Sequence, residues 1–271
     1  MNHAIDNYGY EGKRVLVVGG ASGIGAATAE LVADLGAEVV VADHAEVPFP
    51  CAQAIPLDLR DSASIAAAVD ACGGPVDALF SCAGISEGPD IMGVNVIGQR
   101  ELIERCVDGG LMPEGSAIAM IASGAGLGWS QHLSDILELI DTEGVDAAQA
   151  WCAAHPEFAS YAFSKEVVIV YCAQRAFSFM QKGIRINALC PTSTDTPLAR
   201  RSFGWLEYGT DFRAATAIDV AQPTEQAYPL AFLCSPAASY ISGSFLSVDA
   251  GLQAARMTGT FQPQLPAPPS A

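Results

Sequence analysis

The chain has 271 residues, of which 51% are hydrophobic and 16% are charged, so it can fill one large α/β core. Its 30 acidic residues outweigh 13 basic ones, and a net charge of −17 repels the phosphate backbone of a nucleic acid. No apolar stretch is long enough for a membrane span, and no Cys-x-x-Cys motif or Cys/His cluster indicates a metal. We therefore expect a cytoplasmic protein with eight reduced cysteines and with no nucleic-acid, membrane or metal partner.

Short apolar runs alternate with segments of helical spacing. The first run, 13–19, is rich in Val and ends in glycines, which is typical of a strand buried on both faces. A helical pattern that ends at Gly36 follows, and then a strand at 37–43. The alternation continues with strands at 54–58, 76–84, 116–123 and 184–190 and helices at 61–71, 93–107 and 160–181. This order predicts a single-domain, doubly wound Rossmann-type parallel sheet with helices on both faces.

Three segments interrupt the alternation. Residues 127–157 form an insertion with two stretches of helical pattern, and residues 191–222 form a long connection of the kind that closes over a substrate. Residues 257–271 are Pro-rich and are expected to be extended. We divide the rest of the chain into an N-terminal extension, 1–12, and a catalytic domain, 13–256.

A glycine-rich turn follows the first predicted strand and opens the first helix. Its glycines, Gly19, Gly23 and Gly25, leave the backbone bare, and Ser22 and Ile24 lie between them. The N-terminus of a helix offers free N–H groups and a positive dipole end to a pyrophosphate. The spacing differs from Gly-x-Gly-x-x-Gly, and the glycines alone would also suit a tight strand–helix turn. The flanking strand and helix favour a dinucleotide site.

Asp43 ends the second predicted strand, 18 residues after Gly25. A carboxylate at this place can accept both ribose hydroxyls of adenosine and would repel a 2′-phosphate. Neither the glycine turn nor the segment just after Asp43 contains Arg or Lys. Asp43 alone could simply cap a strand end, but behind a glycine turn it predicts NAD rather than NADP.

The sequence "YAFSK" places Tyr161 and Lys165 one helical turn apart on one face of a predicted helix. A nearby ammonium stabilises a phenolate and lowers the pKa of the phenol. Such a phenol can exchange a proton with an alcohol while a hydride moves. The spacing alone would equally suit an exposed surface pair. The other motifs decide whether the pair is catalytic.

The order of the motifs resembles that of the short-chain dehydrogenase/reductase family over nearly the whole chain. After the glycine turn come "SCAG" at 81–84, "NVIG" at 95–98, "IASGAG" at 121–126 and "YAFSK" at 161–165. A short stretch from Gly84 to Asn95 and a gap of 38 residues from Ser123 to Tyr161 resemble bacterial 3α-hydroxysteroid dehydrogenase/carbonyl reductases and coniferyl-alcohol dehydrogenases.

The resemblance implies a role for each matching residue. Tyr161 would be the general acid/base, Lys165 would tune it and hold the nicotinamide ribose, and Ser123 would bond the substrate oxygen. Asn95 would hold a water that links Lys165 to solvent. The remaining cofactor contacts would come from Asp58 and Leu59 at the adenine, from Cys82, Ala83 and Gly84, and from Pro191, Thr192, Thr194 and Thr196 near the nicotinamide.

One departure from the family pattern concerns "SCAG", which replaces the common Asn-Asn-Ala-Gly. Ser81 and Cys82 must then cover backbone contacts that an Asn side chain would make. A second departure is Thr192, which stands where a Gly usually follows the Pro and adds bulk near the nicotinamide. No catalytic group is lost.

Large apolar residues near Ser123 and in the long connection predict a wall for a bulky alcohol or carbonyl. The same residues could instead pack a mobile lid onto the body. The candidates are Leu127, Trp129, Leu198, Phe203 and Trp205. The expected substrate is a secondary, benzylic or allylic alcohol of steroid, terpenoid or aromatic type, oxidised with NAD.

Two other functions fit parts of the pattern. A ketoacyl-thioester reductase usually uses NADPH and basic residues, which Asp43 and the acidic charge disfavour. A non-catalytic NAD(H)-binding sensor or scaffold is expected to lose Ser, Tyr or Lys, and all are present. The insertion should obstruct the helix pair that usually joins subunits, so we expect a homo-oligomer, a dimer or possibly a tetramer, that forms elsewhere.

Overall fold

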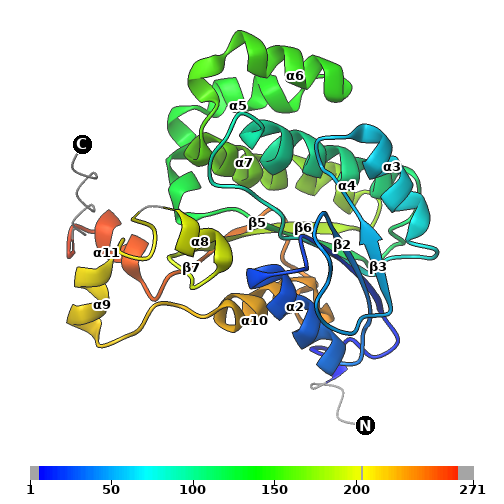
Figure 1. Ribbon diagram of the computed structural model, residues 1–271, viewed down its shortest axis with the longest axis horizontal. Helices are drawn as coiled ribbons and strands as arrows, with labels where there is room; N and C mark the ends of the chain where they lie inside the picture. Colours follow the sequence, from blue (N-terminus) through cyan, green and yellow to red (C-terminus); the bar gives the residue numbers. More distant parts are fainter. Residues whose placement is uncertain (1–5, 203, 262–271) are drawn as a thin grey trace.

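A computed structural model describes residues 6–202 and 204–261. A parallel sheet of seven strands lies between two layers of helices (Figure 1), in the order β3-β2-β1-β4-β5-β6-β7. The order reverses between β1 and β4, which is the place where doubly wound sheets bind ligands. The strands are β1 (Arg14–Val18), β2 (Glu38–Asp43), β3 (Gln53–Pro56), β4 (Ala78–Ser81), β5 (Ala117–Ile121), β6 (Arg185–Pro191) and β7 (Phe245–Val248).

The Val-rich runs form strands because both faces of the sheet are covered. In β1, Leu16 and Val18 point into one apolar core, while Val15 and Val17 point into the other. The first core is closed by α3 (Ser62–Ala71), α4 (Gly98–Asp108) and α7 (Tyr161–Met180). The second is closed by α2 (Gly23–Asp34) and α10 (Pro223–Cys234), which pack on each other. The predicted fold class is confirmed.

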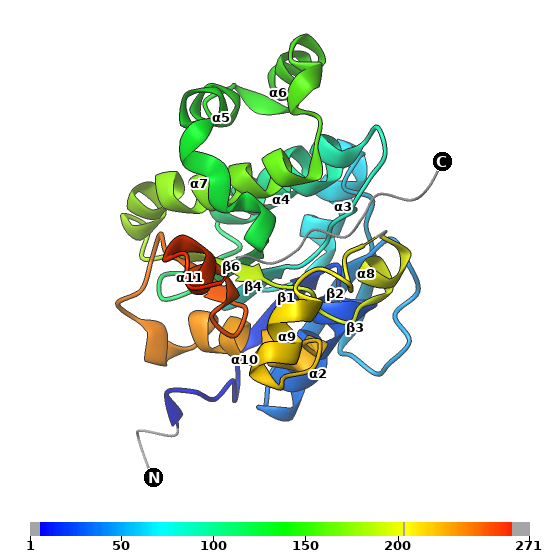
Figure 2. The same ribbon diagram turned by 90° about the vertical axis from the view of Figure 1, so that its left-hand side faces the viewer.

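The insertion folds as two helices, as its pattern predicts. They are α5 (Leu133–Ile140) and α6 (Gly144–Ala154), preceded by the 3-10 segment η2 (Gly124–Gln131) and followed by η3 (Pro156–Phe158). Helix α5 packs on α7, and α6 packs on α4 and on the π turn η1 (Gly93–Ile97). Figure 2 shows both helices on the outer side of the α4–α7 layer, away from the sheet.

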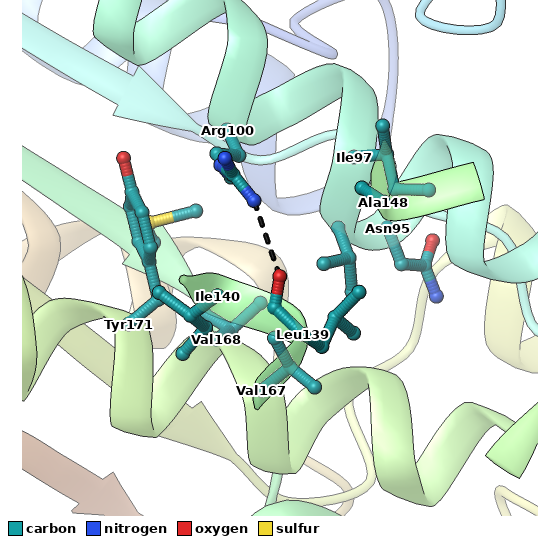
Figure 3. A pocket seen from close by; sticks show the side chains of 11 residues that line it. Asn95, Ile97, Arg100, Leu139, Ile140, Ala148, Val167, Val168 and Tyr171 are labelled. Carbon is teal, nitrogen blue, oxygen red and sulfur yellow. Dashed lines mark hydrogen bonds between the residues drawn. The ribbon is translucent and has the colours of Figure 1, made fainter. Parts of the chain in front are cut away.

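Arg100 of α4 fastens the insertion to the domain. Its guanidinium donates to the carbonyl oxygens of Leu139 and Thr142 at the end of α5, where a cation is favourable. A cavity of about 10 Å³ beside it is lined by Asn95, Tyr171 and apolar side chains (Figure 3). A space of this size holds at most one water, so the joint between insertion and domain is closely packed.

Other parts differ from what the sequence predicts. Tyr10, in the expected N-terminal extension, is fully buried and its hydroxyl donates to Ala231 O at 2.6 Å. The 191–222 connection contains two short helices, α8 (Pro197–Arg201) and α9 (Thr210–Thr216). After α10 and the single turn η4 (Pro236–Ala238), α11 (Leu252–Met257) follows β7. Residues 262–271, most of the expected Pro-rich tail, lie outside the described residues.

Candidate active site

The motifs come together at the carboxyl edge of the sheet. Gly19 follows β1, Asp43 ends β2, Cys82 follows β4, Ser123 follows β5 and Pro191 ends β6. In a parallel sheet all of these strand ends share one edge. The site therefore begins at the switch point between β1 and β4.

The glycine turn is built on close backbone contact. Gly19 has φ +77°, and a Cβ added there would lie 2.4 Å from Ala83 Cα. A Cβ on Gly25 would lie 2.1 Å from Gly19 O, so the first turn of α2 also touches the strand end. Gly23, with φ +57°, faces Thr196 at 3.3 Å. The turn thus contacts both the "SCAG" segment and the long connection.

The start of α2 can bind an anion. Ser22 is the N-cap residue, and its side chain makes no capping hydrogen bond within the described part of the chain. No acidic residue occupies the first turn. Ile24 is half-buried and packs on the second core, which fixes the first turn of α2 and its free N–H groups. These features fit the pyrophosphate of a dinucleotide.

Asp43 is fixed beside the glycine turn. Its side chain is 8% exposed. Oδ2 accepts the Ala21 N–H at 2.8 Å, and Oδ1 accepts the Ala45 N–H at 2.9 Å. Each carboxylate oxygen has a second lone pair, so the group can still accept ribose hydroxyls. The geometry fits the role that the sequence predicts.

The predicted adenine residues behave differently from each other. The Asp58 carboxylate pairs with the Arg60 guanidinium at 2.7 Å, and this hydrogen bond lowers the pKa of Asp58 to about 2. The Leu59 side chain is buried in the first core, and a Cβ on Gly98 would lie 2.0 Å from Leu59 O. Asp58 is therefore at the surface, while Leu59 contributes packing against α4.

Gln99 replaces the missing Asn of the "SCAG" segment. Its side chain is fully buried. Ser81 Oγ donates to Gln99 Oε1 at 2.6 Å, and Gln99 Nε2 donates to Ala83 O at 2.8 Å. Sequence reasoning misses this residue, although its position one helical turn after Asn95 is a signal. Burial raises the pKa of Cys82 to about 12, so its thiol stays neutral.

Asn95 sits in a π turn, a local widening that often occurs at functional sites. Its Oδ1 accepts the Ile85 N–H at 2.8 Å, while Nδ2 donates to Ile85 O at 2.9 Å and to Ser164 Oγ at 3.0 Å. A Cβ on Gly84 would lie 3.3 Å from Asn95 Oδ1 and 3.5 Å from Lys165 Nζ. Asn95 and Lys165 therefore face the same glycine.

Tyr161 and Ser123 meet at the end of β5. Ser123 caps η2 by accepting the Ala125 N–H at 3.2 Å. Tyr161 is the first residue of α7, which Ser160 caps. Burial raises the pKa of Tyr161 to about 12, and the neighbouring Ser123 hydroxyl acts in the opposite direction. The phenol is therefore protonated at neutral pH in this structure.

Lys165 lies beneath the Tyr161 ring. Its side chain is 2% exposed, and Nζ is 5.6 Å from the centre of that ring. Nζ donates to Ile121 O at 2.9 Å. Burial lowers the pKa of Lys165 to about 8, against the opposing effect of Cys82 and Cys190. The sequence predicts that Lys165 lowers the pKa of the Tyr161 phenol, whereas in this structure burial raises it.

The predicted residues after β6 lie along the long connection. Thr194 and Thr196 are buried. Thr194 Oγ1 donates to Thr192 O at 2.9 Å, and Thr196 caps α8. Pro191 is buried at the end of β6. The connection is therefore ordered where the nicotinamide contacts are expected.

The predicted substrate wall assembles in part. The Trp205 ring lies 4.6 Å from the Tyr161 ring, centre to centre, with the two planes tilted by 55°. The Trp129 and Phe245 rings meet edge to face, 6.2 Å between centres. Leu127 and Leu198 are half-buried, and Phe203 lies outside the described residues.

Comparison with known proteins shows the family of the chain. A family model described as "short chain dehydrogenase" matches residues 13–134, and one described as "Enoyl-(Acyl carrier protein) reductase" matches residues 147–253. A cis-4-hydroxycyclohexanecarboxylate dehydrogenase from Sinomonas cyclohexanicum is 33% identical over 89% of this chain and 97% of the relative. A coniferyl-alcohol dehydrogenase from Pseudomonas sp. and a 3-alpha-hydroxysteroid dehydrogenase/carbonyl reductase from Comamonas testosteroni are each 30% identical, over 89% of this chain and 96% of each relative.

Solved structures give the same fold. The 3-alpha-hydroxysteroid dehydrogenase from Pseudomonas sp. B-0831 complexed with NADH superposes with a TM-score of 0.72 at 25% identity, over 92% of this chain and 100% of that one. A 3-ketoacyl-(acyl-carrier-protein) reductase from Brucella melitensis complexed with NADH has a TM-score of 0.68 at 26% identity, over 89% of this chain and 98% of that one. A short chain dehydrogenase from Burkholderia cenocepacia in complex with NADP has a TM-score of 0.67 at 26% identity, over 90% of this chain and 98% of that one.

The candidate site and the sequence relatives point to the same family. Ser123, Tyr161 and Lys165 converge at the edge of a sheet whose first turn is shaped for a dinucleotide. The relatives extend over about nine-tenths of the chain. The chain is an oxidoreductase of the short-chain dehydrogenase/reductase family, which binds a nicotinamide cofactor and acts on alcohols and carbonyls.

Proposed function

We propose that the protein interconverts a ring-bearing apolar alcohol and its carbonyl with NAD(H). The observation that carries the proposal is the contact between the Trp205 and Tyr161 rings, whose centres lie 4.6 Å apart with the ring planes tilted by 55°. An aromatic ring over the catalytic phenol offers an apolar face to a flat or alicyclic substrate.

The proposed cofactor is NAD rather than NADP. Asp43 is held by two backbone N–H groups beside the glycine turn, so its negative charge cannot swing away from an approaching 2′-phosphate. The turn from Gly19 to Gly25 carries no basic residue that could balance that phosphate. When bound, a nicotinamide cofactor supplies or accepts the hydride.

The chain's own residues handle the substrate oxygen and its proton. Tyr161 donates its hydroxyl proton to the carbonyl oxygen during reduction and takes it back during oxidation. Ser123 bonds the same oxygen as charge develops there. Lys165 stands 5.6 Å from the phenol ring as a cation below pH 8, the pKa that burial gives it. The charge of Lys165 favours the phenolate that forms in the reaction. Asn95 binds the water that relays protons between Lys165 and solvent.

Relatives support a ring-bearing substrate. The names of the three curated relatives cited above all describe an alcohol in a ring-bearing molecule: a hydroxycyclohexane carboxylate, coniferyl alcohol and a 3α-hydroxysteroid. Trp205, Leu127 and Trp129 are the proposed wall for such a group. Steroid, terpenoid and aromatic alcohols all remain members of the proposed class.

A ketoacyl-thioester reductase is the second candidate. Its supporting observation is the similarity to the Brucella melitensis reductase, with a TM-score of 0.68. The net charge of −17 opposes it, because an acidic surface repels an acidic carrier or a phosphorylated thioester. The sensor or scaffold hypothesis is opposed by the retention of Ser123, Tyr161 and Lys165 at one end of the sheet.

An absorbance assay at the NADH band tests the proposal. NAD and NADP are compared on cis-4-hydroxycyclohexanecarboxylate, coniferyl alcohol and a 3α-hydroxysteroid, and acetoacetyl-CoA is reduced in parallel. We expect oxidation of at least one ring alcohol with NAD, and a loss of the preference over NADP in Asp43→Ala of about tenfold. Preferred use of NADP, or turnover of the thioester alone, would reject the proposal.

A further inference from the structure

The insertion leaves and rejoins the catalytic domain at one place. His132 is the residue between η2 and α5, and Phe158 ends the insertion in η3. The two rings meet edge to face, 5.8 Å between centres, and His132 meets Phe163 of α7 in the same way at 6.0 Å. Phe158 and Phe163 stack on each other at 4.4 Å. The imidazole of His132 thus packs against both the exit of the insertion and the helix that carries Tyr161.

His132 also holds a buried charge. Its Nδ1 lies 2.7 Å from Glu166 Oε2, and the Glu166 side chain is only 6% exposed. A carboxylate taken out of water is unfavourable unless a donor compensates it. Within residues 6–202 and 204–261, His132 is the one side chain that hydrogen-bonds Glu166. The pair joins positions that are 34 residues apart, across the whole insertion.

Segment η2 rests directly on the backbone of α7 beside this pair. A Cβ on Gly126 would lie 2.6 Å from the carbonyl carbon of Lys165, and a Cβ on Gly128 would lie 3.0 Å from Glu166 Oε1. Two glycines therefore let η2 approach α7 more closely than side chains would allow. The contact therefore involves Glu166, which carries the buried carboxylate, and Lys165, the residue before it.

The two ends of η2 have different anchors. Its first end follows Ser123, which β5 and the capping hydrogen bond to Ala125 hold in place. Its far end is His132, bonded to Glu166. Leu127 and Trp129, the proposed substrate wall, lie between the two anchors. Without the far anchor, β5 and the Ala125 bond still hold Ser123, while Leu127 and Trp129 keep only their packing contacts.

We propose that the His132–Glu166 pair is a positioning clamp that seats η2 on α7 and so sets the place of the substrate wall relative to Tyr161. His132 touches no reacting atom; it acts through Leu127 and Trp129. The substrate readout of this inference rests on the proposed function. The clamp predicts an effect on KM for a bulky alcohol rather than on kcat.

Four variants separate the clamp from plain packing. His132→Leu keeps apolar bulk between Phe158 and Phe163 but removes the donor, while His132→Asn keeps a donor near the place of Nδ1. Glu166→Gln removes the charge. The double variant His132→Leu with Glu166→Gln removes the clamp without leaving an unpaired carboxylate, which controls for a general loss of stability.

The first readout is kinetic, with a 3α-hydroxysteroid as the bulky probe and cyclohexanol as the small one. We expect His132→Leu and the double variant to raise KM for the steroid about tenfold, with kcat and the KM for cyclohexanol within about twofold. His132→Asn should restore most of the affinity. A normal steroid KM in the double variant, or equal effects on both probes, would overturn the clamp.

The second readout needs no turnover. Native-state hydrogen exchange of the 124–131 segment should be about tenfold faster in His132→Leu and in the double variant than in the wild type or His132→Asn. Unchanged exchange in His132→Leu would overturn the clamp even if no substrate is found. Absence of steroid and cyclohexanol turnover in the wild type counts against the proposed function, and the exchange result then decides the clamp by itself.

Discussion

The ammonium of Lys165 donates to the carbonyl oxygen of Ile121 at 2.9 Å, in the interior of the protein. This bond ties the catalytic helix α7 to the last residue of β5, two residues before Ser123. It is also a charge with 2% exposure and no carboxylate bonded to it in the described part of the chain. The active site therefore keeps a buried cation that the fold itself does not favour.

The first prediction concerns stability and pH. Burial lowers the pKa of Lys165 from 10.5 to about 8, so the folded state disfavours the proton relative to the unfolded state. The resulting penalty is full below pH 8, shrinks as the pH rises from 8 to 10.5, and is absent above that. At pH 7 this penalty is about 3 kcal/mol, and the lost bond to Ile121 offsets about 1 kcal/mol of it. Lys165→Met should therefore raise the free energy of unfolding by about 2 kcal/mol, while turnover is lost.

Urea unfolding of the wild type and Lys165→Met at pH 7 and pH 10 checks this prediction. The stability gained by the variant should be smaller at pH 10, because less of the penalty for the buried charge is left there. A gain of the same size at both pH values would show that the charge of Lys165 is not its source.

The second prediction concerns the glycine turn. Gly19→Ala forces a left-handed residue to carry a Cβ 2.4 Å from Ala83 Cα, so we expect a loss of at least about 3 kcal/mol in unfolding free energy and of NADH binding. Gly12→Ala is the matched control, since Gly12 has φ +71° and open space around it. It should lose about 1 kcal/mol. Similar losses in both would mean that the contact with Ala83 is unimportant.

The third prediction concerns Gln99. Gln99→Leu leaves the Ser81 hydroxyl and the Ala83 carbonyl oxygen buried without their partner. We expect a loss of about 3 kcal/mol in unfolding free energy and an NADH dissociation constant about tenfold higher, because Ala83 borders the glycine turn. Gln174→Leu, which removes one exposed bond to Asp141, should change stability by less than about 1 kcal/mol. Unchanged NADH affinity in Gln99→Leu would show that Gln99 does not support the cofactor site.

Much of this architecture can be predicted from the sequence. Alternating Val-rich and helical segments place the core strands, and motif order places Tyr161, Ser123 and Asn95. The pairs that cannot be predicted join residues far apart in the chain, such as His132 with Glu166 and Tyr10 with Ala231. Strand β7 is missed because three of its four residues are exposed and lack the buried pattern. Gln99 is missed because its role depends on which strand end faces its helix.

The fourth prediction concerns assembly. Helices α5 and α6 cover the outer side of α4 and of the first half of α7 (Figure 2), while Phe177 and Met180 near the end of α7 are exposed. Pairing with a second copy along the whole α4–α7 face is therefore obstructed in this arrangement. We propose that a homo-oligomer forms through another surface. Light scattering should give a multiple of the 28.1 kDa chain, and chemical crosslinks should avoid α7. Crosslinks that join α7 to α7 of a second copy would contradict this arrangement.

The central claim is that Tyr161 moves the proton of the substrate alcohol. The most direct measurement is NAD-dependent oxidation of the best ring alcohol by Tyr161→Phe, with NADH binding followed by fluorescence. Tyr171→Phe is the matched control, because the Tyr171 hydroxyl on the same helix is buried without a hydrogen-bond partner among the described residues. We predict a loss of about a thousandfold in kcat with NADH affinity retained for Tyr161→Phe, and near-normal activity for Tyr171→Phe. Substantial turnover by Tyr161→Phe would contradict the account.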